Sequence, residues 1–512
     1  MGDASKYVIS SYLNMLLGTF SAMTLLGLNS IIIARLLGPA DYGLYSVSFS
    51  IPFFLLGFID LGMTTAAQRF ISEYVAKGEL TCAKGVFMLT ASYMLALSSL
   101  TTVILVVLAN YIATAILGRP ELSEYLRIAA FTVVLETVFR YVALNQLLAL
   151  GKSHLSSFID FLHALLRFVF APLLILLGFG IAGALFGALI GYTVAGALGL
   201  SFLVYSFKGM RAETCVSLRD IFSYNAPFMV LGAIGLVSGE AQYVLLSRLE
   251  AASGIGNYVA AMNLTSVLTI FISPLGQISL PTFSRVTDDR QYADAVMKFS
   301  KYALVISLAA QGALLSIAYP LVHLLYGDKY ILAPYLLTLS LSLSIASSFL
   351  SIYGRNSIFY IKRMYKVPIV ENAINVSVFL PLTYFLLTRY GVAGIVLSSW
   401  ASSLAATIYE DVQLGRLIGL NLRTAVPKLL KVEAVALASV PLPLVLEFVI
   451  PYPFNLPASL FTFIVLYGVL MVLTGALSVA EIKDIESNLE NNRLGVILRP
   501  LFKLALSVSR SG

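Results

Sequence analysis

Uncharged apolar runs of about 20 residues, the length that a helix needs to cross a bilayer, recur along the whole of this chain. The first run begins near Tyr7 and stays apolar beyond Ile33. Because the runs are continuously apolar and do not alternate with polar residues, they predict helices and not the strands of a barrel. Only 12% of the 512 residues are charged, whereas soluble domains have about one quarter. The sequence therefore predicts an all-α polytopic membrane protein.

The apolar runs divide into about fourteen predicted membrane spans. The first run is too long for a signal peptide and no small-residue cleavage site follows it, so we expect it to be retained as a helix. The connections between the runs are short and leave no room for a soluble catalytic domain, so we do not expect an enzyme. The predicted spans are residues 7–34, 42–66, 85–109, 122–149, 154–177, 181–207, 221–247, 254–283, 299–326, 330–360, 367–388, 392–416, 425–448 and 457–480.

The connections between the predicted spans alternate between basic and nearly free of basic residues. Cytoplasmic loops of membrane proteins carry an excess of Lys and Arg, so we expect both termini in the cytoplasm, which requires an even number of spans. We assign the net charge of +7 to these loops and expect no nucleic-acid partner. The connections poor in basic residues have only Arg35, Arg119, Arg127, Arg248, Lys329 and Arg389.

Two interruptions of the apolar pattern resemble each other. One reads IIIARLLGPADYGLYSVS from Ile31 and the other LLSRLEAASGIGNYVAA from Leu245. In the first, we expect Pro39 and Gly43 to end one span and redirect the next, which makes a tight outer turn. Arg35 and its counterpart are then expected at the outer membrane interface, as anchors more than as ligands of a cargo.

Further matches at nearly the same separation indicate an internal repeat. The separation stays between about 209 and 213 residues across six predicted spans, which predicts two six-span repeats in the same orientation, followed by two extra spans. Parallel repeats related by an axis along the membrane normal are a known plan of transporters, with the site between the halves. The matched pairs are Arg35 with Arg248, Tyr45 with Tyr258, Gly180 with Gly391, and Asp160 with Glu371.

The repeat predicts four segments along the chain. Residues 1–207 form an N-lobe, 208–418 a C-lobe, 419–480 the two extra spans, and 481–512 a cytoplasmic tail. The tail places apolar residues at helical spacing among basic ones, which fits an amphipathic helix on the inner leaflet. A frayed basic tail fits the same composition.

The opening residues carry a family resemblance. ARLLGPADYGLYS, followed by DLGMTTAAQRFISEY from Asp60 to Tyr74, resembles the start of the Wzx-type flippases of prokaryotic oligosaccharides and polysaccharides. Their superfamily includes the MATE drug antiporters and the peptidoglycan-precursor flippase MurJ. The resemblance implies two six-helix lobes around a V-shaped cavity, with two additional helices in members that move lipid-linked sugars. The rest of the chain matches mainly in architecture, and no site residue is carried over.

The resemblance also implies a function and its partners. The expected cargo is a polyprenyl-(pyro)phosphate-linked oligosaccharide, moved across the cytoplasmic membrane by alternating access for the synthesis of a surface glycan. Membrane lipids and other polysaccharide-assembly proteins are the remaining expected partners.

Arginines inside the predicted spans are the candidates for binding the cargo's phosphates. A charge at bilayer depth costs at least about 2.5 kcal/mol on insertion scales, so it usually faces a cavity or a partner. Arginine stays charged there and binds phosphate through two parallel hydrogen bonds. Arg167 is the leading candidate, followed by Arg140 and Arg355, although Arg355 also fits a place at the inner interface.

Carboxylates inside the spans are candidates for coupling transport to H⁺ or Na⁺, because either ion can neutralise a carboxylate in a cavity. Hydrogen bonding between helices explains the same residues, and an i,i+4 ion pair with Arg140 explains one of them equally well. His163 shares a helix face with Arg167, and we expect it to be a buried histidine with its hydrogen bonds satisfied and not a proton relay. The candidate carboxylates are Asp160, Glu240, Glu371 and Glu136.

The sequence indicates no cofactor, metal site or catalytic residue. Cys82 and Cys215 are too few and too far apart in sequence to argue for a disulfide framework or a metal site. The GKS at residues 151–153 lacks the upstream glycine of a phosphate-binding loop, since Gln146 stands there.

Two other functions fit a helical membrane protein of this kind. A cation-coupled MATE-type exporter of small amphipathic molecules is the main alternative, and the charges inside the spans, which are of both signs, do not separate it from a flippase. A membrane glycosyltransferase or ligase would need an acidic outer loop. The outer connections are short and have only scattered acids such as Glu121 and Glu124.

Overall fold

The computed structural model of the protein describes residues 2–286, 289–478 and 481. These residues form helices, turns and loops without any strand, which confirms the all-α class. Helix occupies every predicted span. The helices are α1 (Gly2–Asp60), α2 (Met63–Lys77), α3 (Leu80–Tyr111), α4 (Ser123–Glu136), α5 (Asn145–Ala149), α6 (Ser153–Leu174), α7 (Gly180–Ser206), α8 (Leu218–Leu249), α9 (Ala252–Ser266), α10 (Thr269–Ser284), α11 (Asp289–Leu315), α12 (Ala318–Tyr326), α13 (Ala333–Ile345), α14 (Arg355–Ile361), α15 (Lys366–Tyr390), α16 (Val392–Ile418), α17 (Leu422–Ser439), α18 (Pro441–Val449) and α19 (Asn455–Leu473), with short π or 3₁₀ segments η1 (Ile112–Ile116), η2 (Pro120–Leu122), η3 (Thr137–Leu144), η4 (Ile175–Phe179) and η5 (Ser348–Leu350).

Within the described ranges, nine helical stretches are long and apolar enough to cross a membrane, and two bent helix pairs raise the number to eleven. Two of the nine stretches contain a break, at Gly38 in α1 and at Gly178 between α6 and α7. At both breaks a glycine has a positive φ, of 76° and 93°, which other residues rarely adopt. The protein is therefore a multi-pass membrane protein, and the count of fourteen spans stays a prediction.

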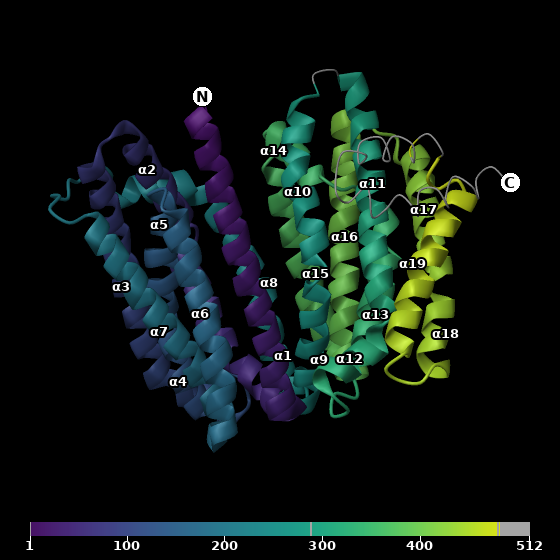
Figure 1. Ribbon diagram of the computed structural model, residues 1–512, viewed down its shortest axis with the longest axis horizontal. Helices are drawn as coiled ribbons and strands as arrows, with labels where there is room; N and C mark the ends of the chain where they lie inside the picture. Colours follow the sequence, from purple (N-terminus) through teal and green to yellow (C-terminus); the bar gives the residue numbers. More distant parts are fainter. Residues whose placement is uncertain (1, 287–288, 479–480, 482–512) are drawn as a thin grey trace. The chain divides into compact units, whose positions relative to one another are not determined.

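The chain packs as two compact units. The first comprises residues 1–260 and 380–395, and the second comprises residues 261–379 and 396–512. In the first unit α6 packs along α7 and α1, and α3 packs on α4 (Figure 1). In the second, α11 packs against α10, α13, α17 and α19. These boundaries follow packing, whereas the predicted lobes at 1–207 and 208–418 follow the sequence repeat and remain a prediction.

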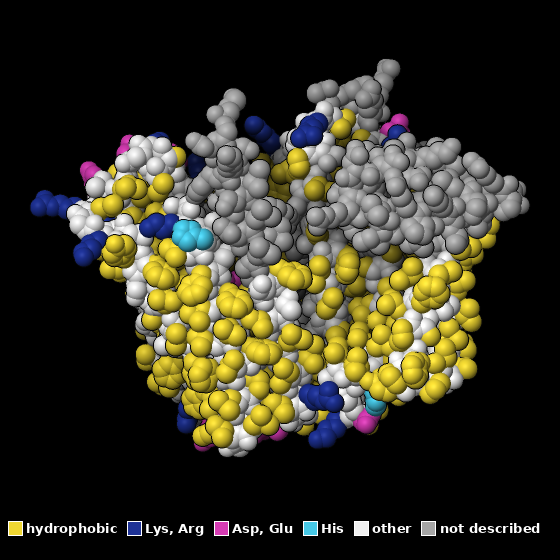
Figure 2. Space-filling view, in the orientation of Figure 1, with side chains coloured by type: hydrophobic (Ala, Val, Ile, Leu, Met, Phe, Trp, Pro, Cys, Tyr) yellow, Lys and Arg dark blue, Asp and Glu magenta, His cyan; other side chains and the backbone are white. Residues whose placement is uncertain are grey.

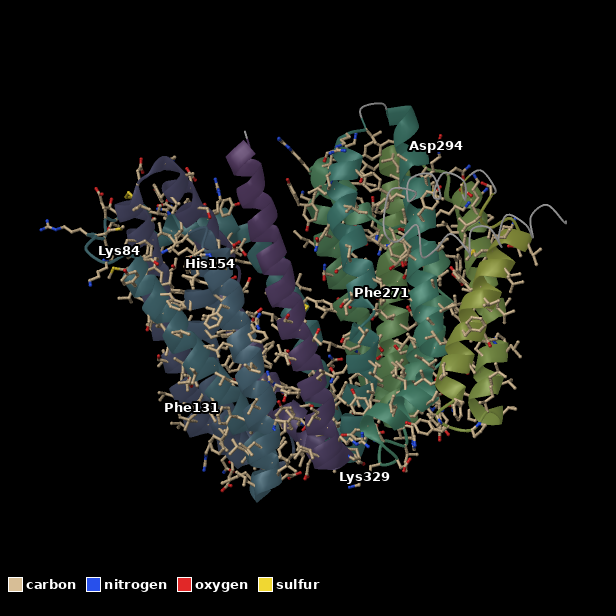
Figure 3. All side chains as sticks on the ribbon, viewed as in Figure 1. Lys84, Phe131, His154, Phe271, Asp294 and Lys329 are labelled. Atoms are coloured by element: carbon tan, nitrogen blue, oxygen red, sulfur yellow. A yellow bond between two sulfur atoms is a disulfide. The ribbon has the colours of Figure 1, made fainter. Side chains whose placement is uncertain are left out.

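The surface of each unit suits a lipid environment. Figure 2 shows hydrophobic side chains over the middle of the helices, with Lys and Arg toward the helix ends. Phe131 in the first unit and Phe271 in the second are each about half exposed. In the first unit Lys84 and His154 lie at the same end of the helices, away from Phe131; in the second, Asp294 and Lys329 lie at opposite ends (Figure 3).

The turn at Gly38 and the helix after it contact the start of α9, the segment that the predicted repeat matches with this turn. A Cβ added at Gly43 would lie 2.1 Å from the carbonyl oxygen of Ala252, and one at Gly256 would lie 1.8 Å from that of Pro39. The second half of α1 therefore touches the backbone of α9. The expected role of Gly43 is corrected: Gly38 and Pro39 make the turn, and Gly43 lies inside the helix, where its missing side chain permits this contact.

Two arginines join the end of α8 to the segment around η1 through hydrogen bonds to backbone carbonyls. Arg119 Nε donates to the carbonyl oxygen of Ser247 over 2.8 Å, and Arg248 Nε donates to that of Ile116 over 2.6 Å. Both acceptors are near the C-terminal ends of helical segments, where carbonyls lack partners within the helix. Arg248 is thus a reciprocal backbone cap here, besides its expected place at the outer interface.

We expect Gly43→Ala to lower the stability of the protein. Its methyl group would collide with the Ala252 carbonyl, and overpacking of this kind costs about 1–3 kcal/mol. Thermal unfolding of the detergent-solubilised protein measures the loss. Gly27→Ala, also in α1, is the matched control because a Cβ there has no described atom within 4 Å. Equal midpoints for the two variants would contradict the close contact.

The tenth predicted span is broken. It contains α13, the short η5 segment and α14, with non-helical backbone between them. Such backbone is tolerated at membrane depth only where protein or water satisfies it. Glu433 of α17 accepts a hydrogen bond from the Phe349 amide over 2.5 Å, and Trp400 Nε1 donates to Ser347 Oγ over 3.2 Å. Helix α17, in the first of the two predicted extra spans, thus supplies an acceptor for a backbone amide at the break.

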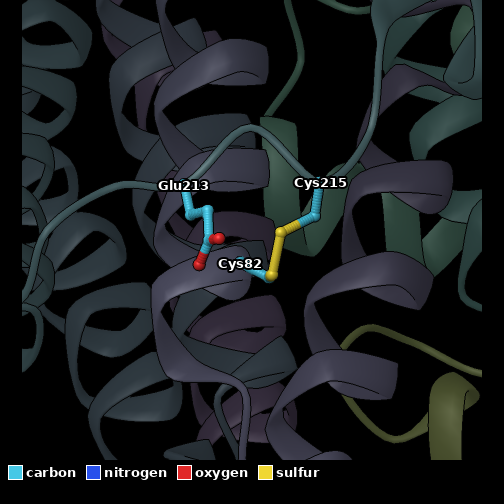
Figure 4. A group of neighbouring side chains, drawn as sticks. All are labelled: Cys82, Glu213 and Cys215. Atoms are coloured by element: carbon cyan, nitrogen blue, oxygen red, sulfur yellow. A yellow bond between two sulfur atoms is a disulfide. The ribbon is translucent and has the colours of Figure 1, made fainter.

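A disulfide joins Cys82, in the first turn of α3, to Cys215 in the linker between α7 and α8 (Figure 4). Nothing in the sequence argues for this bond, because the cysteines are few and far apart along the chain. They are 133 residues apart in sequence but their Cα atoms are 5.4 Å apart, because the linker runs back across the start of α3. The predicted amphipathic tail, apart from Glu481, lies outside the described residues.

Candidate functional site

Most of the predicted site residues lie in two charged clusters, one in each compact unit. The first cluster contains Arg167, Arg140, Asp160 and Glu136, on α4, η3 and α6. The second is built around Arg355 and Glu371, on α14 and α15. Glu240 lies apart from both, half-buried on α8 near Tyr243.

A π-helical segment shapes the first cluster. The segment η3 begins directly after Glu136 and interrupts the fourth predicted span. Within it, Arg140 Nε donates to Glu136 Oε1 over 2.9 Å, which confirms the ion pair that the i,i+4 spacing indicates. The Glu136 side chain is 7% exposed and that of Arg140 is 46% exposed. Arg140 thus keeps accessible N–H donors while Glu136 fixes its direction; π segments often occur at functional sites.

Arg167 is held by an aromatic side chain and not by an acid. One of its terminal nitrogens donates to the hydroxyl oxygen of Tyr45 over 2.9 Å, and its guanidinium carbon lies 6.0 Å from the ring centre of Phe49. Both aromatic residues belong to the second half of α1. Its Nε is buried without an acceptor, and no described carboxylate lies within ion-pair distance of Arg167. The guanidinium therefore has a full positive charge and an unused donor.

His163, one turn before Arg167 on α6, packs between two aromatic rings. Its ring lies 4.4 Å from the ring centre of Phe139 and 4.6 Å from that of Tyr192. The side chain is 1% exposed, and neither ring nitrogen has a hydrogen-bond partner in the described part of the chain. The expected hydrogen-bonded histidine is therefore not what the described residues show: the ring is held by stacking on other rings. Gly191 of α7 permits it, since a Cβ there would lie 3.1 Å from the His163 ring.

Asp160 completes the first cluster. It is half-buried on α6, one turn before His163, and the charge of Arg140 acts on it. Asp160 and Arg167 are about 10 Å apart along the helix axis at 1.5 Å per residue, which explains why they do not pair. Arg140 thus lies near both acids of the cluster, whereas the charge of Glu136 acts on Arg167 only from beyond ion-pair distance.

The second cluster is an ion-pair network at the start of α14, the last helix of the broken tenth span. Arg355, the first residue of α14, forms an ion pair with Glu410 of α16, and its guanidinium lies 3.2 Å from Asp411 Oδ1. A third contact runs to Thr407 Oγ1 over 3.3 Å. The side chains of Arg355, Glu410 and Asp411 are 18%, 2% and 10% exposed. Glu371 of α15 is close enough for both Arg355 and Glu410 to act on it.

Glu410 and Asp411 are not among the site residues predicted from sequence. The signal that could have found them is an adjacent acidic pair inside the predicted span 392–416, where two charges need a partner. One oxygen of Glu410 is buried without a hydrogen-bond partner, as far as the described residues show. Asp411 also lines a small cavity together with Phe349, Leu350 and Leu429. The cluster has more negative than positive charge, so it can accept a small cation or a proton.

Residues 9–287 match the family described as polysaccharide biosynthesis protein. Among curated proteins, the succinoglycan biosynthesis transport protein ExoT of Rhizobium meliloti is 27% identical over 319 residues. The match covers 61% of this chain and 61% of that protein, so the chain spans less than two thirds of the curated relative that it matches.

Solved structures share the fold at low sequence identity. The lipid II flippase MurJ in an inward closed conformation matches with a TM-score of 0.70 and 13% identity, over 90% of this chain and 98% of that one. An inward-facing MATE family multidrug transporter gives 0.65 and 16%, over 77% and 94%. A transporter of the same superfamily from Pyrococcus furiosus gives 0.56 and 15%, over 83% and 96%. These likenesses establish the architecture that MurJ and the MATE transporters share.

Proposed function

Because the chain belongs to the polysaccharide biosynthesis protein family, we propose that it is a flippase for a lipid-linked oligosaccharide. It moves a polyprenyl-(pyro)phosphate-linked glycan across the cytoplasmic membrane by alternating access, for the synthesis of a surface polysaccharide. The fold shared with a lipid II flippase and the match to a succinoglycan transport protein support this proposal. These relatives are named as transport proteins and flippases, which also supports the absence of an enzymatic role.

The observation that carries the proposal is the unmatched charge of Arg167. A lipid pyrophosphate must pass through a region of low dielectric constant, where an anion without a partner is costly. Arg167 has an unused donor and no carboxylate within ion-pair distance among the residues described. Its bond to Tyr45 fixes the direction of the guanidinium, and a phosphate that enters the site would accept from the donor that is buried and unused here, as part of the two parallel hydrogen bonds that arginine makes to phosphate.

Arg140 and Arg355 are the second and third phosphate ligands in this proposal. Arg140 keeps accessible N–H donors although it pairs with Glu136. The guanidinium of Arg355 is already engaged by Glu410 and Asp411. A phosphate can bind this guanidinium only when those carboxylates lose part of their negative charge.

That competition suggests how an ion gradient drives transport. A proton or a Na⁺ ion taken up by Glu410 or Asp411 weakens their hold on Arg355, whose guanidinium then becomes available to the cargo. Release of the ion restores the pair and displaces the phosphate. Glu371 lies beside this pair, while Asp160, Glu136 and Glu240 are candidates outside it. The proposed coupling ion is H⁺ or Na⁺.

The proposed topology has both termini in the cytoplasm, two lobes at residues 1–207 and 208–418, and two extra spans at 419–480. The alternation of basic loops supports it. In this topology the linker between α7 and α8 and the start of α3 lie on the cytoplasmic side.

Transfer of a labelled polyprenyl-pyrophosphate oligosaccharide between the leaflets of reconstituted vesicles tests the function. We expect transfer to accelerate under a proton or Na⁺ gradient and to lose this acceleration in Glu410→Gln, because the neutral side chain no longer takes up the ion. Glu73→Gln is the matched control, since Glu73 is exposed and pairs only with Lys77 at 2.7 Å among the described residues. Vesicles that transport small amphipathic cations but not the lipid-linked glycan would favour a MATE-type exporter instead.

A further inference from the structure

The two cysteines of the chain lie where the first repeat is joined to the second. Cys82 is buried at the start of α3, and Cys215 lies in the linker between Ser206 and Leu218. Their Cα atoms are 5.4 Å apart, within the range of about 4.4–6.8 Å that disulfides use. The residues next to Cys215 on its N-terminal side are exposed, so small molecules in solution can reach this site.

Non-covalent contacts hold the linker against α3 independently of the disulfide. The Glu213 amide donates to the carbonyl oxygen of Thr81 over 3.2 Å, and Thr81 Oγ1 donates to Glu213 Oε2 over 3.1 Å. Lys84 Nζ donates to the carbonyl oxygen of Met210 over 2.8 Å. A Cβ at Gly85 would lie 1.8 Å from the Glu213 carbonyl oxygen, so the linker backbone rests directly on the helix. These contacts keep the two sulfur atoms close when the bond is reduced, and the bond can then form again.

The linker leads directly into α8. Ser217 and Asp220 form a reciprocal cap: the Ser217 amide donates to Asp220 Oδ2 over 2.9 Å, and the Asp220 amide donates to Ser217 Oγ over 3.3 Å. This cap fixes the first turn of α8 two residues after Cys215. A covalent bond at Cys215 therefore restrains the start of the first helix of the second repeat relative to α3 of the first.

The linker belongs to the basic set of connections, with Lys208, Arg211 and Arg219, and so to the proposed cytoplasmic side. Cytosolic thiols are usually kept reduced, and disulfides found there are commonly transient or redox-sensing. A pair of cysteines held in bonding geometry on that side is therefore placed to change state with the redox balance of the cell.

We propose that Cys82 and Cys215 form a reversible thiol–disulfide site, oxidised by exchange with a small-molecule disulfide, that fastens the α7–α8 linker to α3 and slows transport. One cysteine thiolate attacks the external disulfide and releases one thiolate, and the second cysteine displaces the other. Two protein thiols lose two protons and two electrons, and the external disulfide is reduced to two thiols. The effect on transport rests on the proposed flippase function; the chemistry of the site does not.

The test uses the full-length protein in lipid vesicles, equilibrated with defined ratios of reduced and oxidised glutathione. A maleimide mass tag counts the free thiols, and limited digestion with trypsin after Lys208 and Arg211 reports the freedom of the linker. We expect two tags, fast cleavage and fast transfer in the reduced protein, and no tags, slow cleavage and transfer slowed several-fold in the oxidised protein. Cys82→Ser and Cys215→Ser should each show one tag and rates that do not change with redox balance.

Each readout can overturn part of the proposal. Two free thiols at every glutathione ratio, or a disulfide that no ratio reduces, would refute a reversible site. Rates of cleavage and of transfer that are the same with and without the disulfide would refute the proposal that the bond fastens the linker to α3. One zinc ion per reduced chain, held by the two thiolates and Glu213 and lost in both Ser variants, would replace the switch with a metal site. If no variant transfers the glycan, the flippase proposal fails, while the tag and cleavage results still decide the thiol site.

Discussion

Arg167→Ala is expected to slow leaflet transfer of the lipid-linked glycan by about ten- to hundredfold, because a hydrogen bond to a charged group contributes about 1.5–3 kcal/mol. The guanidinium has a buried Nε without an acceptor among the described residues, so the substitution removes both a charge and an unused donor from the proposed site. Initial rates in vesicles of equal protein content measure the effect.

Two further variants separate charge from geometry. Arg167→Lys keeps the charge but cannot make two parallel hydrogen bonds, so we expect an intermediate rate. Tyr45→Phe removes the hydroxyl that orients the guanidinium, and we expect a smaller loss than in Arg167→Ala. Arg127→Ala removes one exposed positive charge from the same unit and serves as the matched control. Wild-type transfer by Arg167→Ala would remove this residue from the proposed site.

Arg355→Ala is expected to destabilise the protein by about 3–5 kcal/mol, because it leaves buried carboxylates without their partner. Glu410 and Asp411 are only 2% and 10% exposed, so water cannot replace the guanidinium. The midpoint of thermal unfolding in detergent should fall strongly. Lys77→Ala breaks an exposed pair with Glu73, and we expect no measurable change in its midpoint.

Replacing all three residues of the network by neutral ones shows whether the instability of Arg355→Ala comes from unpaired charge or from lost packing. The triple variant Arg355→Met, Glu410→Gln, Asp411→Asn removes all three charges together, and we expect it to recover most of the stability, since buried ion pairs often add little over neutral groups of similar volume. A triple variant as unstable as Arg355→Ala would show that the loss comes from packing and not from unpaired charge.

The positions of the helices could be predicted from sequence because hydropathy reports membrane spans directly, but the break inside the tenth predicted span could not. The predicted span 330–360 is mostly apolar, and Pro334 is its last proline. Helix α13 nevertheless ends at Ile345, and α14 begins only at Arg355. The break depends on partners far along the chain, such as Glu433 of α17. No local pattern contains that information.

Some residues of the candidate site could likewise be predicted from sequence, and others could not. Arg167 and Arg140 are visible in the sequence because a charge inside an apolar run stands out. Tyr45 is not, because aromatic residues are common in spans and its bond to Arg167 joins residues 122 positions apart. Glu410 and Asp411 near the end of a predicted span fit an interfacial position as well as a buried one, and only the pairing with Arg355 decides between the two.

The bond between Glu433 and the Phe349 amide also bears on how chains of this architecture gain or lose helices. In a twelve-span relative without α17, that amide would need another acceptor, because an unsatisfied backbone group in hydrocarbon costs several kcal/mol. The two extra helices therefore cannot be deleted as an independent module. Their loss would have to be accompanied by a straight tenth helix or by a new polar side chain facing residue 349, and such paired changes are what a comparison of long and short relatives should find.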